Sequence, residues 1–164
     1  MNIETLVLGP LETNCYILTI NNKCLIIDPA DEFQKIKQSI GNKEVIGCLI
    51  THFHPDHIGA LEEVLTYYDL SLNQVKENIF NYEVIETPGH TNDSKTYYFK
   101  KENIMFDGDF IFKDGIGRLD LGGNEEDMKN SIETILKYPK KTILYPGHGE
   151  PTTIGDEKNA LELF

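Results

Sequence analysis

The sequence predicts an α/β fold with two mixed β-sheets packed between helices. Short runs of β-branched and apolar residues alternate along the chain with segments of helical periodicity. Hairpins are expected between some of these runs, which favours mixed sheets over purely parallel ones. Four of the predicted strands end at a histidine or an aspartate beside glycine or proline. Ligands in open α/β layers commonly lie at such strand ends, so these positions are the candidate functional site.

The first half of the chain supplies most of the clear strand patterns. The segment Asn21-Asn22-Lys23 predicts a tight hairpin between two strands. Apolar residues at positions 33, 36 and 40 have helical spacing, and Gly41 follows as a stop. The expected order is strands at 4–9, 15–20 and 24–28, a helix at 31–40, a buried strand at 45–51 and an amphipathic helix at 58–68.

The second half of the chain has a similar alternation of predicted strands and helices. A strand is expected to end at Gly89-His90, and a hairpin at Asp107-Gly108-Asp109. Asn124 is a suitable N-cap for a helix because its side-chain oxygen can accept from the first backbone N–H groups. The expected elements are a strand at 82–90, a hairpin at 96–109, a helix at 124–138 and a strand at 141–149.

Length and composition restrict the class of protein. A chain of 164 residues with 40% hydrophobic residues is expected to form one domain over 1–164. The net charge of −12 argues against a nucleic-acid partner, and no apolar run reaches the roughly 20 residues that span a bilayer. The start has no signal-peptide pattern, and three cysteines form no CxxC pair. We therefore expect a cytoplasmic protein that acts on a small molecule, with its oligomeric state open.

All five histidines lie at predicted strand ends or on the turn after one. Imidazole nitrogen and carboxylate oxygen are good ligands for zinc and its first-row neighbours. Alternate residues of an extended segment point the same way, so His52 and His54 can bind one ion. His90 is expected to complete that set. The alternative is a polar turn of hydrogen-bonded imidazoles.

A second ion is predicted beside the first. Asp56 and His57 follow Pro55, where the chain turns, and His148 is expected to join them. Asp109 can bridge both ions, which leaves room for a shared water as in a catalytic site. Asp56 is also the predicted catalytic residue, because it would orient that water. The alternatives are an N-cap role for Asp56 in helix 58–68 and a turn role for Asp109.

The pattern His52-x-His54-x-Asp56-His57, followed by single His, Asp and His residues, resembles the metallo-β-lactamase superfamily. The likeness to its small single-domain branch related to glyoxalase II covers almost the whole chain. That resemblance implies an α/β fold (α+β in some schemes), a four-layer αβ/βα sandwich of two mixed β-sheets flanked by helices, with a dinuclear metal site in the cleft between the sheets. It is carried by GPLETNCYIL (9–18), IIDPA (26–30), TPGHT (87–91), GD (108–109), GIGRLDLGG (115–123) and YPGHGEPTTIGDEKN (145–159).

Two departures from the family pattern are visible. His57 and His90 are only 33 positions apart, whereas relatives usually carry a longer segment there. The chain also ends at TTIGDEKNALELF, so the C-terminal glutathione-binding helical domain of glyoxalase II is expected to be absent.

Other polar residues stand beside the predicted ligands. Arg118, the single arginine, lies in the loop 115–123 and can bind a substrate carboxylate. Its alternative role is a salt bridge to Asp114 or Asp120. Lys113 is a weaker candidate for the same substrate contact. Asp28 and Asp107 are expected either to orient the imidazoles or to form turns.

These residues predict a hydrolase in which two divalent ions, most simply zinc with iron or manganese as alternatives, activate a shared water. A thiolate leaves readily because a free thiol has a pKa of about 8.5, so a thioester is the preferred substrate. A lactone or activated ester is the second choice. The family resemblance also implies an alternative, an oxidoreductase of the persulfide dioxygenase type, in which one non-haem iron would be bound by His52, His90 and Asp109. A non-catalytic metal-binding module is the remaining possibility.

Overall fold

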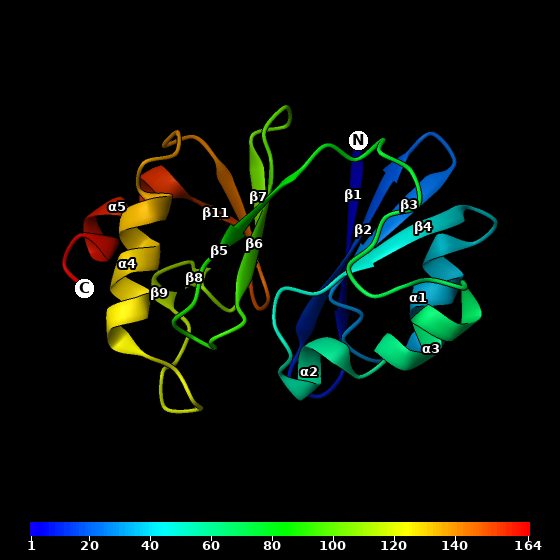
Figure 1. Ribbon diagram of the computed structural model, residues 1–164, viewed down its shortest axis with the longest axis horizontal. Coiled ribbons are helices and arrows are strands. Elements are labelled where there is room, and N and C mark those ends of the chain that lie inside the picture. Colours follow the sequence, from blue (N-terminus) through cyan, green and yellow to red (C-terminus); the bar gives the residue numbers. More distant parts are fainter. The chain divides into compact units, whose positions relative to one another are not determined.

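The computed structural model describes residues 1–164, and the chain forms two compact units, Met1–Asn81 and Tyr82–Phe164. Each unit contains a mixed β-sheet with helices packed on it (Figure 1). The predicted α/β class with two mixed sheets and flanking helices is therefore confirmed. The single domain expected over 1–164 stays a prediction.

The first unit contains a four-stranded sheet in the order β1-β2-β3-β4. Strand β2 runs antiparallel to both β1 and β3, whereas β4 runs parallel to β3. Parallel pairing requires a crossover, which the helix α1 supplies. The elements are β1 (Asn2–Leu8), β2 (Thr13–Ile20), β3 (Lys23–Ile27), α1 (Phe33–Ile40), β4 (Glu44–Leu49), α2 (Pro55–Ile58) and α3 (Leu61–Tyr67).

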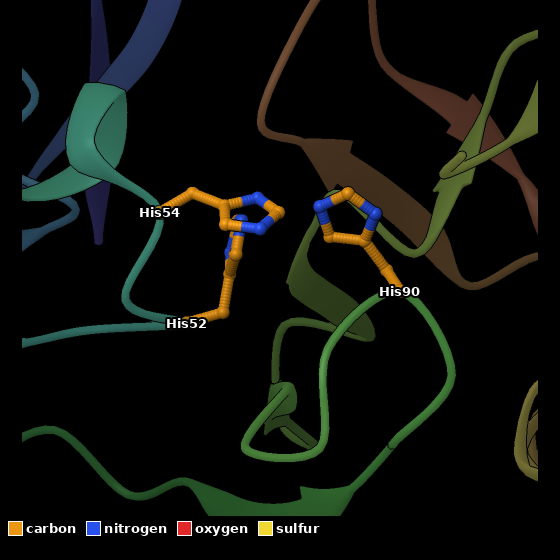
Figure 2. A group of neighbouring side chains, drawn as sticks. All are labelled: His52, His54 and His90. Atoms are coloured by element: carbon orange, nitrogen blue, oxygen red, sulfur yellow. The ribbon is translucent and has the colours of Figure 1, made fainter. Parts of the chain in front are cut away.

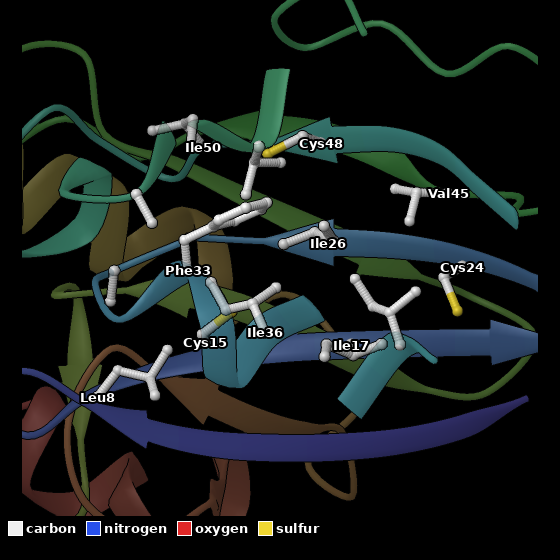
Figure 3. Packing of buried hydrophobic residues seen from close by; sticks show 14 residues of the cluster. Leu8, Cys15, Ile17, Cys24, Ile26, Phe33, Ile36, Val45, Cys48 and Ile50 are labelled. Atoms are coloured by element: carbon white, nitrogen blue, oxygen red, sulfur yellow. The ribbon is translucent and has the colours of Figure 1, made fainter. Parts of the chain in front are cut away.

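Helices α1 and α3 pack on this sheet through one cluster of buried hydrophobic residues, several of which Figure 3 labels. Phe33, Ile36 and Ile40 of α1 are buried, at the spacing that the sequence pattern indicated. They pack against alternate side chains of the strands, such as Cys15 and Ile26. The three cysteines are free thiols within this core cluster, as expected for small apolar residues.

The helix expected at 58–68 is instead two helices, α2 and α3, with a break at Gly59 and Ala60. Ala60 donates its backbone N–H to the carbonyl of Pro29 at 3.0 Å. A Cβ on Gly59 would lie 2.3 Å from the carbonyl oxygen of Ala30. The close approach of segment 29–31 therefore breaks the helix, and only glycine fits at the point of contact.

The second unit contains a five-stranded sheet in the order β11-β10-β7-β6-β5 and a two-stranded hairpin, β8-β9. Strands β10 and β7 are parallel, and the other pairs are antiparallel. The elements are β5 (Glu83–Glu86), β6 (Lys95–Phe99), β7 (Ile104–Gly108), β8 (Ile111–Phe112), β9 (Gly115–Ile116), α4 (Glu125–Ile135), β10 (Ile143–Pro146), β11 (Thr152–Thr153) and α5 (Ile154–Leu161).

Helices α4 and α5 pack on one face of the second sheet through residues such as Ile132 and Ile154. Asn124 is the N-cap of α4 and accepts from the backbone N–H of Asp127, as predicted. The sequence analysis did not find α5, β11 or the hairpin β8-β9. These elements are short, with two to eight residues each, so periodicity carries little information about them.

None of the helices is long and apolar enough to cross a membrane. Strands β4, β5, β7 and β10 are each followed within a few residues by a predicted metal ligand. The strand expected at 82–90 is shorter, because β5 ends at Glu86 and residues up to His90 form a turn. Gly89 has φ 148° in that turn, and a Cβ there would lie 2.6 Å from Cα of Met128.

Candidate metal centre

The segment after β4 brings two predicted ligands of the first unit together. The ring centroids of His52 and His54 lie 4.8 Å apart, and each offers a nitrogen within 4.8 Å of one on the other. Figure 2 shows both imidazoles extending from the same stretch of backbone, one on either side of Phe53 in sequence. His52 is buried and His54 is partly exposed. This is the pair that the alternating spacing predicted.

Asp56 and His57 lie one turn further on, within α2. Nε2 of His57 lies 3.5 Å from Oδ2 of Asp56, and that oxygen also accepts a hydrogen bond from the Thr13 hydroxyl at 2.8 Å. Asp56 is not an N-cap: His54 occupies the N-cap position of α2, and Ala60 that of α3. The alternative reading of Asp56 is therefore wrong, and its carboxylate is held beside His57 by a residue of β2.

Asp28, which directly follows β3, organises this turn. Its Oδ1 accepts from the backbone N–H of Thr51 at 2.7 Å, and its Oδ2 accepts from the Thr51 hydroxyl at 2.6 Å. Oδ2 also lies 2.9 Å from Nδ1 of His57. A carboxylate only accepts, so Nδ1 of His57 carries the proton and Nε2 carries the lone pair.

His52 is oriented through the same network. Its Nδ1 lies 3.1 Å from the Thr51 hydroxyl oxygen, whose proton is already donated to Asp28. Nδ1 of His52 must therefore donate, which again leaves Nε2 with the lone pair. Both buried imidazoles of the turn are thus held in the tautomer that a metal ligand requires.

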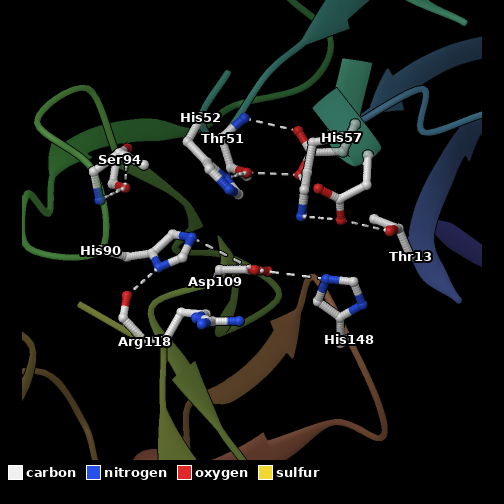
Figure 4. A network of polar contacts seen from close by, with 12 residues as sticks. Thr13, Thr51, His52, His57, His90, Ser94, Asp109, Arg118 and His148 are labelled. Atoms are coloured by element: carbon white, nitrogen blue, oxygen red, sulfur yellow. Dashed lines mark hydrogen bonds and ion pairs between the residues drawn. The ribbon is translucent and has the colours of Figure 1, made fainter. Parts of the chain in front are cut away.

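The second unit brings its three predicted ligands together in the same way. Oδ2 of Asp109 lies 3.6 Å from Nε2 of His90 and 3.5 Å from Nε2 of His148 (Figure 4). A backbone hydrogen bond of 2.7 Å from Gly147 to Gly108 ties the loop after β10 to the end of β7. Asp109 therefore stands between two imidazoles, the position expected of a shared ligand.

His90 is oriented by the loop that follows β9. Its Nδ1 lies 2.7 Å from the backbone carbonyl oxygen of Arg118, which can only accept. Nε2 of His90 therefore carries the lone pair, as in His52 and His57. Gly117 allows this approach, since a Cβ there would lie 1.7 Å from the Asp109 carbonyl oxygen and 3.0 Å from Nδ1 of His90.

Asp107 lies near the end of β7, two residues before Asp109. Its carboxyl group is 2% exposed and accepts from the backbone N–H of Ile111 at 3.2 Å. Its Oδ1 is buried without a hydrogen-bond partner. Burial raises the pKa of this carboxyl well above its usual range, and the charge of Asp109 raises it further. It contacts the backbone of β8 and does not orient an imidazole.

The two predicted substrate residues make exposed ion pairs. Arg118 donates from Nε and Nη2 to the two oxygens of Asp120 at 2.6 and 2.5 Å, which lowers the pKa of Asp120 to about 2. Lys113 donates to Glu150 at 3.1 Å. One of the two local partners considered for Arg118 is thus confirmed, and substrate binding by either cation stays a prediction.

The donor set fits a divalent transition metal. It consists of five imidazoles and two carboxylates, which is the ligand chemistry of zinc and iron. Three of the imidazoles, those of His52, His57 and His90, are held in the required tautomer. The structure brings together His52, His54, Asp56 and His57 in one unit and His90, Asp109 and His148 in the other. The expectation that the two sets share two ions stays a prediction.

Sequence reasoning missed the residues that orient the ligands through a hydroxyl or a backbone group. Thr13 and Thr51 contact Asp56 and His52, and no sequence signal distinguishes them from other threonines. The carbonyl of Arg118 is likewise invisible in sequence. Gly117 lies in a glycine-rich loop, and that composition was a usable sign of close backbone approach.

Comparison with known proteins gives a consistent family. Residues 8–72 and 69–148 match the sequence profile of the Metallo-beta-lactamase superfamily. The chain is 34% identical over 193 residues to a probable metallo-hydrolase, YqgX, of Bacillus subtilis, with 92% of each chain covered. It is 29% identical over 206 residues to the hydroxyacylglutathione hydrolase GloC of Haemophilus influenzae, with 98% of this chain and 96% of that protein covered.

Solved structures agree with this result. The BLEG-1 B3 metallo-beta-lactamase superposes with a TM-score of 0.90 at 29% identity, covering 96% of this chain and 97% of that one. TTHA1623, crystallised in a di-iron-bound form, superposes with a TM-score of 0.85 at 27% identity, covering 94% of this chain and 96% of that one.

These alignments also bear on the short segment between His57 and His90. The alignment with the Bacillus protein runs over 193 positions, more than the 164 residues of this chain, so that relative carries residues that this chain lacks. The profile match breaks at 69–72, directly after α3. The break lies within the segment that the sequence analysis expected to be short.

Proposed function

Because the chain belongs to the metallo-beta-lactamase superfamily, we propose that it is a hydrolase that uses two divalent metal ions to cleave a small thioester. The observation that carries the proposal is the common tautomer of His52, His57 and His90. Each has an acceptor at Nδ1 that leaves its Nε2 lone pair for a cation. A hydrogen bond from Nδ1 to an acceptor is the arrangement that metal-ligating histidines have.

We propose that each ion takes three of the seven ligands and shares the seventh. His52, His54 and His90 form the first set. Asp56, His57 and His148 form the second, and Asp109 belongs to both. Asp109 supports this role because its Oδ2 lies at nearly equal distances from His90 and His148.

When bound, such ions lower the pKa of water toward about 7 and polarise a carbonyl group. The protein's own contribution is to hold the ligands and to direct one proton. The Thr13 hydroxyl donates to Oδ2 of Asp56 and so orients the carboxylate that we propose accepts a proton from the attacking water. A thiolate leaving group needs no strong general acid, since its pKa is about 8.5.

A thioester is favoured by the relatives. The Haemophilus protein named hydroxyacylglutathione hydrolase is matched over 96% of its length. Almost all of that protein therefore has a counterpart in this chain, which supports a similar substrate class. Activated esters and lactones are the next candidates, because their carbonyl chemistry is the same. Zinc is the most suitable ion for this ligand set, and iron is supported by the di-iron form of TTHA1623.

A second candidate is hydrolysis of a β-lactam, favoured by the likeness to BLEG-1 at 29% identity. A third is oxygen-dependent oxidation of a persulfide by one iron on His52, His90 and Asp109, a set of two imidazoles and one carboxylate. The three candidates differ in metal count and in co-substrate, so one set of measurements separates them.

The test is to purify the protein from its native host, to count its metal ions by mass spectrometry, and to assay it on matched substrates. The panel contains S-lactoylglutathione, an acyl thioester of a smaller thiol, a lactone, nitrocefin, and a persulfide with oxygen uptake recorded. We expect two ions per chain and thioester cleavage that a chelator abolishes and added zinc restores. A single iron with oxygen uptake, β-lactam cleavage alone, or no turnover of any substrate would overturn the proposal.

A further inference from the structure

Glu157 of α5 has a buried carboxyl group that the proposed chemistry does not use. It is 5% exposed, although glutamate is normally a surface residue. Its Oε1 accepts from the Thr152 hydroxyl at 2.5 Å, and its Oε2 accepts from the backbone N–H of Asp114 at 3.0 Å. Burial of a charged group costs stability unless the group is hydrogen-bonded. The two hydrogen bonds therefore account for a glutamate at this buried position.

The more informative of the two contacts is the one to Asp114. This residue forms the turn of the hairpin β8-β9 and has φ 64°, in the left-handed region. Glu157 therefore holds a strained turn from a helix that lies 43 positions further along the chain. A side chain that bonds a backbone N–H in a turn fixes where the whole hairpin lies.

The hairpin held in this way contacts the predicted ligands of the second unit. The ring of Phe112 in β8 lies edge-on to the ring of His148, with centroids 6.2 Å apart. Directly after β9, the carbonyl of Arg118 accepts the hydrogen bond from His90, and Gly117 lies against the Asp109 carbonyl. One short hairpin and the loop after it thus contact all three ligands.

We propose that Glu157 is a positioning residue for this ligand set, acting through the turn of β8-β9. It holds the hairpin so that Arg118 keeps His90 in its metal-binding tautomer and Phe112 keeps the ring of His148 in place. The exposed pair Lys113–Glu150 also links the hairpin to the C-terminal segment, but exposed ion pairs contribute little. Ile111 of the hairpin packs in one core cluster with Ile154 of α5, and apolar packing does not direct a hydrogen bond. The effect on metal binding rests on the proposed function, whereas the effect on the His90 hydrogen bond does not.

The test compares Glu157→Met with Glu157→Gln. Methionine fills the space but cannot accept from Asp114. Glutamine can accept from Asp114 through its oxygen and donate to Thr152 through its amide, because a hydroxyl also accepts. Glu162→Met is the control, since it makes the same change at an exposed position following the same helix.

The first measurement is ¹⁵N NMR of histidine-labelled, metal-free protein. We expect the Nδ1 proton of His90 to exchange with water at least about tenfold faster in Glu157→Met than in the wild type. Zinc affinity, measured by chelator competition, should fall about 10- to 100-fold. Glu157→Gln and Glu162→Met should match the wild type in both readouts.

A folded Glu157→Met protein with wild-type proton exchange and zinc affinity would overturn the proposal. An equal change in Glu157→Gln would also overturn it, because the negative charge of Glu157, and not its hydrogen bond to Asp114, would then be responsible. If Glu157→Met does not fold, Thr152→Val removes one of the two hydrogen bonds and is expected to accelerate proton exchange severalfold. No acceleration in that variant would also overturn the proposal. Failure of the wild type on every substrate would instead refute the proposed hydrolase and leave the NMR result standing.

Discussion

Oδ2 of Asp28 accepts a hydrogen bond from Nδ1 of His57 across 2.9 Å, and both side chains are buried. Asp28 follows β3 and His57 lies in α2, 29 positions later. The parallel pairing of β3 with β4 brings them together, because their carboxyl ends meet at one edge of the sheet. The carboxylate therefore decides which nitrogen of His57 can bind a cation.

The first prediction concerns Asp28→Asn. The Asp28 carboxylate accepts from three donors: the N–H and hydroxyl of Thr51 and Nδ1 of His57. Asparagine has only one acceptor oxygen, so its amide group must face at least one of these donors. We expect zinc affinity to fall about 10- to 100-fold in chelator competition. Asp69→Asn is the control, because Asp69 has the same φ of 51° and is exposed; equal affinities in both variants would refute the role of Asp28.

The second prediction compares two glycines of one loop. A Cβ on Gly117 would lie 1.7 Å from the Asp109 carbonyl oxygen, whereas a Cβ on Gly115 would meet nothing within 4 Å. Gly117→Ala should destabilise the fold by about 1 to 3 kcal/mol or more, because backbone has to move. It should also reduce the number of bound ions. Denaturant unfolding and metal analysis measure the two effects, and Gly115→Ala should change neither; a neutral Gly117→Ala would contradict the loop geometry.

The third prediction separates the two roles of Arg118. His90 bonds the backbone carbonyl of Arg118, and the guanidinium pairs with Asp120 at an exposed position. Arg118→Gln should therefore leave metal content and thermal stability unchanged. If the guanidinium binds a substrate carboxylate, KM should rise several-fold at constant kcat. Lys113→Gln is the parallel variant, and unchanged kinetics in both would exclude these cations from substrate binding.

The fourth prediction concerns the buried thiols. Burial raises the pKa of Cys15 and of Cys48 above the usual value, with the nearby charge of Asp28 adding to the shift. The unfolded chain releases thiol protons above pH about 8.5 while the folded chain keeps them. The free energy of unfolding should therefore decrease as the pH rises from about 8.5.

Urea unfolding at pH 7.5 and pH 9.5 measures this slope, and the double variant Cys15→Ala/Cys48→Ala should show a smaller one. Native protein at pH 8 should also react slowly with Ellman's reagent, since all three thiols are buried. Rapid titration of the thiols without denaturant, or an unchanged slope in the double variant, would contradict this account.

Much of the candidate site could be predicted because the candidate ligands follow strands with clear apolar patterns. The strands before His52, Asp109 and His148 were located to within a few residues, and the ligand types follow from side-chain chemistry. The helix expected at 58–68 was wrong because a carbonyl from segment 29–31 contacts Gly59, a contact with no local signal. The hairpin β8-β9 and α5 were missed because they depend on contacts such as Glu157 to Asp114.

By itself, the sequence determined the α/β class, the order of the longer strands and the seven candidate ligands, since these depend on residue type and local spacing. Only the tertiary structure decided which nitrogen of His57 and of His90 carries the proton. Nδ1 of His57 is bonded by a residue 29 positions away, and Nδ1 of His90 by a carbonyl 28 positions away. A histidine has two chemically similar nitrogens, so the distant acceptor that the fold places beside one of them makes the choice.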